Sequence, residues 1–454
     1  MDKVLFGLGK RGYALMIAVA AALGGLLFGY DTSVISGAIL FVRQQFHLTS
    51  VETEVAVSIV LAGAAIGAGF AGSFGDRYGR RPVLIVNAVL FGVFAMLTGM
   101  ANSLPLFLAA RFVIGVAVGV ASMLTPLYIA ELAPPNIRGA LVTLNQLAIV
   151  TGIVVAYYVD YLFSGSANWR AMFISAVVPS VILLVALMFL PESPRWLVVR
   201  GRVDAAFRIL DRVESTDEAR RHLEELKMVT ETDRLRFRDL FRGRFSKPLM
   251  IGVGLAIFQQ ITGVNAIIYY TPTILQMAGF KSAQSAILAT VLVGGVNLIV
   301  TMAALLLVDR LGRRPLLLVG IGGMMVSLTL LGYLFGAPHV SRVAILSDVL
   351  VYLACFAIGL GPVFWLLISE IYPTTIRGQA MSVASVTIWI FDLVVSVTFL
   401  SLIGAVGAKF SFWIYAAACV VAFVFAFWLV PETKGRTLEE IEESWAGQSL
   451  PASK

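Results

Sequence analysis

The sequence predicts an all-α membrane protein of twelve transmembrane helices, built as two six-helix halves. Composition is the first reason: of 454 residues, 59% are hydrophobic and 13% are charged, whereas soluble domains typically have about 45–50% apolar and about 25% charged residues. The second reason is that long apolar runs recur, each able to cross a hydrocarbon core of about 30 Å as a helix. The third is an internal repeat. A β-barrel would instead show short segments of alternating polarity.

The apolar runs define twelve expected spans, separated by short polar or glycine-containing segments. The first run is too long for the apolar core of a secretory signal peptide, so we expect it to remain in the membrane. In chain order the expected spans cover residues 13–40, 54–74, 82–101, 105–129, 140–161, 170–190, 249–277, 285–308, 315–336, 344–368, 379–403 and 409–430.

Positive charge gathers in the loops on one side of the expected membrane. The segments DRYGRR (76–81) and DRLGRR (309–314), and the loops around Arg138 and Arg377, all fall on the side of the N-terminus. Loops on the other side carry few lysines or arginines. The positive-inside rule therefore predicts that both termini are cytoplasmic.

Residues 195–247 differ from the rest of the chain, because they contain 14 Lys/Arg and 10 Asp/Glu side chains. DAAFRILDRV (204–213) and EARRHLEELKMV (218–229) space their apolar residues at helical intervals. Mixed charge and scarce aromatic residues argue against a nucleic-acid-binding arm. We expect a cytoplasmic helical domain, within an order of N-terminal half (1–194), cytoplasmic domain (195–247), C-terminal half (248–430) and cytoplasmic tail (431–454).

Three motifs occur twice at offsets of 233 to 240 residues, which indicates two homologous halves in the same orientation. Such parallel duplication is typical of transporters, in which one half rocks against the other around a central site. The repeated pairs are GDRYGRRP (75–82) with VDRLGRRP (308–315), AELAPPNIRG (130–139) with SEIYPTTIRG (369–378), and PESPR (191–195) with PETKGR (431–436).

The repeated D-R-x-G-R-R loops also predict ion pairs at the cytoplasmic ends of the spans. Membrane orientation and a glycine turn would explain the loops alone, but an acid repeated with the arginines suggests pairing. Bidentate Arg–carboxylate contacts are directional, and they suit a latch that holds the halves together while the site faces outward. The candidate gate residues are Asp76, Arg80, Glu131, Arg138, Asp309, Arg313, Glu370 and Arg377.

Five motifs together resemble the sugar porter family of the major facilitator superfamily: GDRYGRR, PESPRW, QQITGVNAIIYY, GPVFWLLISEIYP and PETKGRTLEE. They occur in the family's order, and the resemblance runs from the first span to the C-terminal tail. It implies the major facilitator fold with twelve transmembrane helices, an intracellular helical domain between the halves, and a hexose or pentose substrate. Within that family, the chain resembles the bacterial sugar/proton symporters.

A sugar presents hydroxyl groups and an apolar ring face, so a site at membrane depth needs neutral donors and acceptors and an aromatic surface. Gln259, Gln260 and Asn265 of span seven, with Gln146 of span five, are the amide candidates. Amides also link membrane helices, and a single Gln would favour that interpretation. Three amides at 259, 260 and 265 cannot all face one neighbour, and the resemblance implies sugar-binding residues at matching positions.

Aromatic candidates come from spans seven, ten and eleven. Trp365 follows GLGP (359–362), where Gly and Pro weaken the helix and allow a bend, and it matches the sugar-contact Trp of the resembled family. Trp389 lies about ten residues into its span, too deep for an interfacial aromatic belt. Tyr269 and Tyr270 lie nearer the outer end of span seven, where they are expected to close over the sugar.

Span eleven departs from the resembled pattern at two positions. Sugar porters often carry an amide just before the span-eleven Trp, where this chain has Ile388. Asp392 stands one turn after Trp389, where an amide is more usual. We expect Asp392 to be either an unusual sugar ligand or a second titrating group.

The stretch FGYDTSVISG (28–37) places Asp31 inside span one. A charged carboxylate at membrane depth costs at least about 2.5–3.5 kcal/mol, so it must be paired, hydrated or protonated. Arg111, in span four, is the clearly intramembrane basic residue that could pair with it. At 1.5 Å per residue, Asp31 lies about 13 Å and Arg111 about 9 Å below the outer end of their spans, so the two are expected to meet.

This pairing predicts a proton switch. Ionised Asp31 would hold Arg111, and a proton from outside would neutralise Asp31 and free Arg111 for the rearrangement that carries sugar inward. A static ion pair is the alternative. The resemblance favours the switch, because sugar/proton symporters carry Asp at this position and facilitative glucose transporters typically carry Asn.

The sequence therefore predicts uptake of a monosaccharide coupled to inward proton movement, in the cytoplasmic (inner) membrane. The alternatives are a facilitative sugar uniporter, a sugar sensor that does not transport, and, on fold alone, a drug–proton antiporter. An enzyme is not expected, because the chain shows no P-loop, metal-ligand cluster or nucleophile–base pair. Cys355 and Cys419 are expected to be packing thiols, with no cofactor or metal. The expected partners are the sugar, the proton and the lipid bilayer, without nucleic acid, for a monomeric protein.

Overall fold

The computed structural model describes residues 10–134, 137–231, 240–241, 245–338, 341–373, 376–436 and 438–445. Regular secondary structure within these ranges is helical, and eleven of the helices there are long and apolar enough to cross a membrane. The prediction of an all-α membrane protein with many spans is confirmed.

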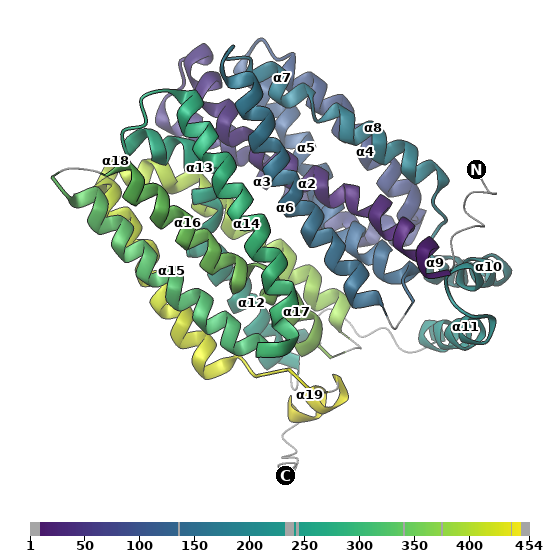
Figure 1. The fold of residues 1–454 in the computed structure, drawn as a ribbon. Helices are drawn as coiled ribbons and strands as arrows, with labels where there is room; N and C mark the ends of the chain where they lie inside the picture. Colours follow the sequence, from purple (N-terminus) through teal and green to yellow (C-terminus); the bar gives the residue numbers. More distant parts are fainter. Residues whose placement is uncertain are drawn as a thin grey trace. The chain divides into compact units, whose positions relative to one another are not determined.

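The spans follow the predicted order along the chain (Figure 1). Those of the N-terminal half are α2 (Lys10–Phe46), α3 (Ser50–Tyr78), α4 (Arg80–Gly99), α5 (Leu104–Leu132), α6 (Arg138–Ser164) and the pair α7 (Trp169–Ile174) and α8 (Val177–Phe189). Those of the C-terminal half are α12 (Ser246–Ile261) with α13 (Val264–Met277), α14 (Ala283–Leu311), α15 (Arg313–Gly336), α16 (Arg342–Ile358) with α17 (Leu360–Ile371), and α18 (Arg377–Leu429).

The long helix α18 contains two spans. Its 53 residues would extend about 80 Å at 1.5 Å per residue, more than twice the thickness of a hydrocarbon core. Gly407 interrupts it with φ 81° and ψ 158°, a conformation that only glycine adopts readily. The break falls between the expected spans 379–403 and 409–430, so the eleven long helices provide the twelve predicted spans.

Glycine residues also break the seventh and tenth spans. Gly359 separates α16 from α17 with φ −105° and ψ −101°, which is the bend expected from the GLGP segment. Gly263 separates α12 from α13 with φ 88°, a left-handed conformation. The sequence predicts a continuous span seven over 249–277, so the break at Gly263 is a difference that the structure adds.

Close packing divides the chain into two compact units, described separately below. Unit 1 comprises Met1–Thr32, Gly63–Ala156 and Arg170–Arg234, and unit 2 comprises Ser33–Ala62, Tyr157–Trp169 and Leu235–Lys454. The ends of α2, α3 and α6 that lie away from the basic loops therefore pack with the C-terminal helices. Within unit 2, α15 and α18 run side by side (Figure 1).

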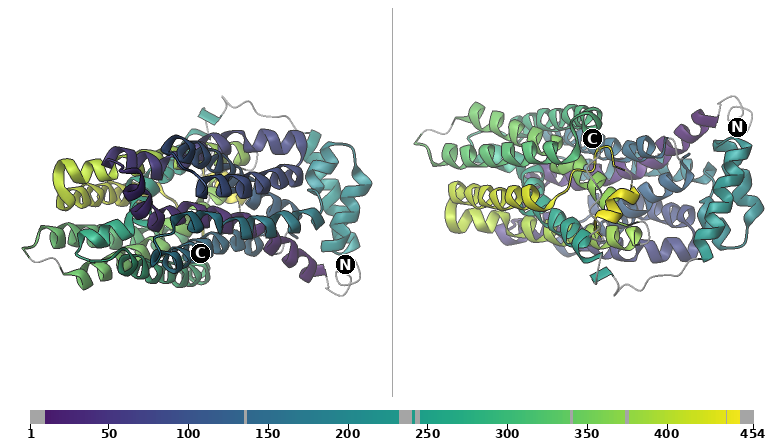
Figure 2. Two further views of the ribbon diagram at one scale, coloured as in Figure 1. Left: turned by 90° about the horizontal axis from the view of Figure 1, so that it is seen from above. Right: turned by 90° about the horizontal axis from the view of Figure 1, so that it is seen from below.

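Three short helices, α9 (Pro194–Val199), α10 (Val203–Val213) and α11 (Thr216–Glu231), form the predicted amphipathic segment. Both views of Figure 2 show them lying across one end of the unit 1 helices. Trp196 Nε1 donates to the carbonyl oxygen of Asp76 at 3.0 Å, which ties α9 to the end of α3. Residues 232–239 and 242–244 of the expected cytoplasmic domain lie outside the described residues. The core shared by the three helices consists of Leu197, Val198, Ala206, Leu210, Ala219 and Leu223.

The expected tail holds one further short helix, α19 (Leu438–Trp445), in unit 2. Trp445 Nε1 donates to the carbonyl oxygen of Ile371 at 3.2 Å, so α19 packs at the end of α17. Residues 437 and 446–454 of the tail lie outside the described residues.

Candidate functional site

Asp31 of α2 and Arg111 of α5 meet inside unit 1. Arg111 Nη1 donates to Asp31 Oδ1 at 2.7 Å, and Arg111 Nη2 lies 3.5 Å from the Asp31 carbonyl oxygen. The Asp31 side chain is 4% exposed and the Arg111 side chain is 0% exposed. The Phe173 ring packs against the guanidinium, with its centroid 5.4 Å from Cζ. The structure thus brings the two predicted residues into contact, while their part in proton coupling stays a prediction.

Close helix packing positions Asp31. At Gly29, an added Cβ would lie 1.9 Å from the carbonyl oxygen of Ile149, so α2 and α6 approach each other there in a way that only glycine allows. One residue before Asp31, the Tyr30 hydroxyl donates to the carbonyl oxygen of Met172 at 2.9 Å. Asp31 therefore lies on a helix that contacts α6 at Gly29 and α7 at Tyr30.

The Asp31–Arg111 pair is incompletely satisfied. Asp31 Oδ2 and Arg111 Nε are both buried without a hydrogen-bond partner in the described part of the chain. A buried ion pair repays the cost of removing two charges from water only when its remaining donors and acceptors are also satisfied. The pair therefore adds little stability over an apolar contact, which weakens the static interpretation of it.

Asp392 of α18 is the centre of a polar cluster in unit 2. Its Oδ2 accepts hydrogen bonds from Asn265 Nδ2 at 2.8 Å and from the Tyr269 hydroxyl at 3.0 Å. Its Oδ1 accepts from Ser396 Oγ at 3.1 Å. The residue is 1% exposed. Asp392, one of the two positions at which span eleven departs from the resembled pattern, thus connects α18 to α13.

The three amides of the seventh span differ in their contacts. Gln259 Nε2 donates to the carbonyl oxygen of Leu360 at 2.9 Å, which links α12 to the start of α17. Gln260 accepts from Asn265 Nδ2 at 2.8 Å and therefore joins the Asp392 cluster. Gln259 makes the inter-helix link that was the alternative interpretation, whereas Gln260 and Asn265 extend the cluster across the break at Gly263.

The two adjacent tyrosines of α13 point to different partners. Tyr269 reaches Asp392, as described above. Tyr270 is fully buried, donates to the carbonyl oxygen of Ser396 at 3.1 Å, and stacks on Phe399 with ring centroids 5.0 Å apart. Tyr270 thus packs α13 against α18, and of the two tyrosines it is Tyr269 that joins the cluster.

The remaining candidates lie on three different helices. Trp389 is buried one turn before Asp392 on α18. Trp365 is half-buried on α17, with its ring edge against Phe364 at a centroid distance of 5.1 Å. Gln146 is half-buried on α6 and belongs to unit 1, whereas the other sugar-site candidates belong to unit 2.

Arg80, at the start of α4, forms the first predicted ion-pair cluster in unit 1. Its Nε and Nη2 donate to the two carboxylate oxygens of Glu131 at 3.0 and 3.1 Å, and Nη2 lies 2.9 Å from Asp76 Oδ1. Arg138 is not part of this geometry, and its Nε is buried without a partner among the described residues. The cluster therefore joins α3, α4 and α5 within one half of the chain.

Arg313, at the start of α15, repeats the arrangement in unit 2. Its Nη2 donates to Glu370 Oε1 at 2.9 Å, its Nε lies 3.2 Å from Oε2, and its Nη1 lies 2.9 Å from Asp309 Oδ1. Arg377 Nε donates to the carbonyl oxygen of Tyr372 at 3.2 Å. Both clusters connect helices of the same half, so each stabilises the ends of its own bundle.

Two acidic residues that the sequence analysis did not assign complete these clusters. Glu192 accepts from the backbone N–H groups of Arg80 and Arg81 at 3.1 and 3.3 Å, and Glu432 accepts from those of Arg313 and Arg314 at 3.1 Å. Each carboxylate caps a helix N-terminus, where unpaired N–H groups and the helix dipole favour negative charge. Their repetition in PESPR and PETKGR was the signal that could have identified them.

The two capping carboxyls differ in their pKa. Burial raises the pKa of Glu192 above its ordinary value, and it outweighs the lowering effect of the backbone N–H groups around that carboxyl. Burial acts in the same direction at Glu432, but there the N–H groups of Lys434, Arg313, Arg314 and Thr433 bring the pKa below its ordinary value. The same cap is therefore electrostatically different in the two halves.

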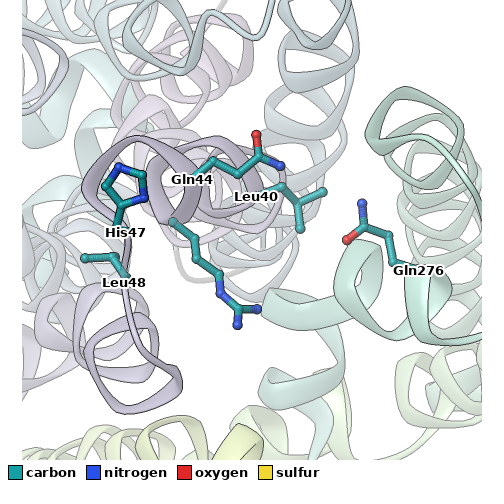
Figure 3. Close-up of a pocket in the computed structure, with 6 residues that line it drawn as sticks. Leu40, Gln44, His47, Leu48 and Gln276 are labelled. Carbon is teal, nitrogen blue, oxygen red and sulfur yellow. The ribbon is translucent and has the colours of Figure 1, made fainter.

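A cavity of about 460 Å³ lies where α2 and α13 end, in unit 2. Figure 3 shows Leu40, Gln44 and His47 on the α2 side and Gln276 on the α13 side. None of the predicted sugar-site residues lines it. Among the described residues, no group of three His, Cys, Asp or Glu side chains could hold a metal ion.

Comparison with known proteins places this geometry in a family. The family described as "Sugar (and other) transporter" matches residues 17–445. The arabinose-proton symporter of Escherichia coli (strain K12) is 38% identical over 447 residues, covering 96% of this chain and 94% of that protein. The probable metabolite transport protein CsbC of Bacillus subtilis (strain 168) is 40% identical over 433 residues, covering 94% of each.

Solved structures agree with the sequence relatives. The proton:xylose symporter XylE of E. coli, bound to 6-bromo-6-deoxy-D-glucose, matches with a TM-score of 0.82 at 36% identity, covering 95% of this chain and 99% of that chain. XylE in an inward open conformation matches with a TM-score of 0.81. The match extends over nearly the whole of both chains. This chain therefore belongs to the sugar transporter family of the major facilitator superfamily, a family of transporters and not of enzymes.

Proposed function

We propose that this protein carries a monosaccharide, a hexose or a pentose, together with a proton by alternating access. The observation that carries the proposal is the buried, incompletely satisfied contact between Asp31 and Arg111. The relatives support both parts of it, because they include arabinose-proton and galactose-proton symporters and a proton:xylose symporter.

The basic loops set the proposed orientation. Arg80 and Arg313 begin α4 and α15 at the ends of the spans where the Lys- and Arg-rich loops gather. The positive-inside rule places these ends, α9 to α11 and both termini in the cytoplasm. The opposite ends of α2, α3, α6 and α13 then face outward, and the membrane is the cytoplasmic (inner) membrane of a bacterium.

Asp31 carries the proton in this mechanism. While ionised, it holds the Arg111 guanidinium at 2.7 Å. A proton from outside removes the charge of the carboxylate, weakens that contact and lets α2 and α5 shift relative to each other. Inward movement of one charge supplies about 2.3 kcal/mol per 100 mV of membrane potential. That energy supports a sugar gradient of roughly 50-fold per 100 mV.

The Asp392 cluster supplies the sugar ligands. Its carboxylate accepts hydrogen bonds from sugar hydroxyls, while Gln260 and Asn265 can both donate and accept. Trp389, one turn before Asp392, and Trp365 offer aromatic faces for the apolar side of the ring. Gln146 contributes from the N-terminal half, so that sugar binding engages both halves.

Uptake by the purified protein in sealed liposomes tests the function. A panel of hexoses and pentoses is offered under an inward proton gradient, with the external pH recorded. We expect one or more sugars to accumulate, the external medium to become alkaline during influx, and a protonophore to abolish accumulation. Saturable sugar entry without alkalinisation would show a uniporter instead, and sugar binding without entry would show a sensor.

Two variants test the residue assignment. Asp31→Asn removes the titratable group and should abolish accumulation while leaving sugar exchange between the two sides. Asp348→Asn is the matched control, because Asp348 is also a buried span carboxyl, bonded to Ser327 Oγ at 3.0 Å. The control should accumulate sugar normally. Accumulation by Asp31→Asn at the unmodified level would remove Asp31 from the mechanism.

A further inference from the structure

Asp160 of α6 is another carboxyl buried in the spans of the N-terminal half, besides Asp31 and Glu54. Its Oδ2 accepts one hydrogen bond, from the backbone N–H of Gly37 on α2, at 3.1 Å. Its Oδ1 is buried with no partner among the described residues, and the residue is 0% exposed. This carboxyl is separate from the Asp31–Arg111 pair, and the proposed symport mechanism does not use it.

The contact between α2 and α6 is shaped around this carboxyl. A Cβ added at Gly37 would lie 2.5 Å from Asp160 Oδ2, so the close approach requires glycine at that position. One turn before Asp160, the buried Tyr157 hydroxyl donates to the carbonyl oxygen of Ile268 on α13 at 3.0 Å. Asp160 therefore lies beside a contact that joins the N-terminal half to the C-terminal half, within unit 2.

Three of the other buried carboxyls in the described spans have stronger partners. Asp31 has a guanidinium, Asp392 has three side-chain donors, and Glu54 of α3 accepts two hydrogen bonds from Ser401 of α18. Asp348, on α16 of the C-terminal half, is like Asp160 in having one neutral donor, a serine hydroxyl, and one oxygen without a partner among the described residues. Asp160 has one backbone N–H, which does not balance a full negative charge.

The ionisable groups near this site do not supply a cation. On α6 the neighbour is Tyr157, and on α13 the residues after Ile268 are Tyr269 and Tyr270. On α2, Asp31 and Arg43 are each six residues from Gly37, about 9 Å along the helix axis. None of the described residues forms an ion pair with Asp160, so the neutral acid is the form that this buried site accommodates.

We propose that Asp160 is a proton-binding site that must take up a proton from the outer side before the outer ends of the two halves pack together. The proposal rests on the orientation and alternating access given under the proposed function. When the outer ends separate, α13 leaves Tyr157 and water reaches the Asp160 carboxyl, which ionises. When the outer ends pack together again, the Asp160 carboxylate returns to a site without a positive charge to pair with. Asp160 must therefore bind a proton before the ends can close. That proton goes back to the outside on reopening and is not carried across.

This coupling between proton binding and closure limits how strongly the closed-to-open ratio can depend on pH. One proton bound only in the outer-closed state raises the ratio of closed to open molecules by up to about tenfold for each unit by which the pH falls. Asp31 also titrates in the proposed mechanism. The effect of Asp160 is therefore measured in an Asp31→Asn background, which removes the titration of Asp31.

Distance measurement between spin labels provides the test. Val51 at the start of α3 and Val406 in α18 are exposed, at 60% and 42%, and belong to different halves. The native cysteines are first removed by Cys355→Ser and Cys419→Ala, and spin labels are attached to cysteines introduced at these two positions. Pulsed electron paramagnetic resonance in detergent then measures the distance between the labels, which reports the separation of the outer ends. In the Asp31→Asn background we expect the short-distance population to increase as the pH falls from 8 to 5. Adding Asp160→Asn should make that population large at every pH.

Two further variants keep the test decisive. Asp348→Asn in the same background should leave the pH profile unchanged. Gly37→Ala places a methyl group against Asp160 Oδ2 and should enlarge the open population at every pH, so it provides a readout even if Asp160→Asn fails to fold. An unchanged profile in Gly37→Ala, or a pH dependence that survives Asp160→Asn, would overturn the proposal.

Uptake distinguishes this proposal from the function on which it rests. Asp160→Asn with Asp31 intact should still accumulate sugar and make the external medium alkaline, because its own proton is not transported. Loss of alkalinisation in that variant would place Asp160 on the transported-proton path and contradict the proposal. Loss of alkalinisation in the unmodified protein would instead contradict the proposed symport.

Discussion

Glu54 of α3 accepts two hydrogen bonds from Ser401 of α18, one from its backbone N–H at 2.6 Å and one from its hydroxyl at 2.5 Å. The two residues come from different halves of the chain, and Glu54 is 1% exposed. Tyr270 and Tyr415 lie close enough to the carboxylate to interact with it electrostatically. Both carboxylate oxygens are therefore used in holding together the ends of the two halves that lie away from the basic loops.

The first prediction concerns this contact between Glu54 and Ser401. Glu54→Gln keeps the shape of the side chain, and its amide can still accept from the Ser401 N–H and donate to the Ser401 hydroxyl oxygen. Both contacts then lose the negative charge of the carboxylate, which makes them weaker. Hydrogen bonds to a charged group contribute about 1.5–3 kcal/mol, so the closed-to-open ratio should fall roughly tenfold or more. Spin labels at Val51 and Val406 measure it. Ser401→Ala, which retains the backbone N–H, should shift the ratio in the same direction by less, and a larger shift than in Glu54→Gln would contradict the assignment.

The second prediction concerns the energetics of the Asp31–Arg111 pair. Arg111→Gln leaves a buried carboxylate without its partner, a change that typically costs about 3–5 kcal/mol. The double variant Asp31→Asn/Arg111→Gln removes both charges and should recover most of that loss, since the pair itself adds little stability. Thermal unfolding in detergent measures both. Uptake assays should show that the double variant still fails to accumulate sugar. Accumulation by the double variant would show that the Asp31–Arg111 pair is not needed to couple sugar uptake to proton movement.

The third prediction uses the two adjacent tyrosines of α13 as a matched pair. Tyr269→Phe removes a hydroxyl that orients Asp392, so sugar affinity should weaken roughly fivefold, the equivalent of one hydrogen bond of about 1 kcal/mol. Tyr270→Phe removes a hydroxyl that bonds the Ser396 carbonyl oxygen, so it should lower thermal stability and leave affinity unchanged. Half-saturation constants for exchange measure affinity. Equal effects of the two substitutions would place the sugar away from Asp392.

The spans and the Asp31–Arg111 contact could be predicted because they depend on chain-local quantities. Apolar run length defines a span, and the rise per residue places a side chain at a depth. Breaks are harder to predict. The Gly–Pro combination at 359–362 indicated one. Gly263 is an isolated glycine in an apolar run, and the features that distinguish it, a left-handed φ and a Cβ position only 3.0 Å from the Tyr415 ring, appear only in the folded chain.

Contacts between distant segments could not be predicted from such quantities. Glu54 and Ser401 are 347 residues apart, and their pairing requires the placement of one span against another. The expectation that Tyr269 and Tyr270 would act together overlooked helical geometry. Neighbouring residues on a helix are about 100° apart, so adjacent side chains face different partners. Asp392 was identified as a departure from the pattern, but its central position depends on side-chain directions.

The last prediction compares the two caps, Glu192 and Glu432, which make similar hydrogen bonds but have opposite pKa shifts. The folded-state pKa of Glu432 is below its ordinary value of 4.5. Its ionised form therefore stabilises the fold above that value, and this contribution is lost as the pH falls through the folded-state pKa. The folded-state pKa of Glu192 is above 4.5, so ionisation at higher pH disfavours the fold relative to the unfolded chain.

The Gln variants at these two positions should therefore show opposite pH trends in thermal unfolding. For Glu432→Gln, the stability deficit relative to the unmodified protein should be largest at neutral pH and shrink as the pH falls below 4.5. For Glu192→Gln, any deficit should shrink as the pH rises above 4.5, because the unmodified protein then bears the cost of a buried charge. Parallel trends in the two variants would mean that the caps have the same electrostatic environment. The backbone N–H groups around Glu432 would then not be the cause of its lowered pKa.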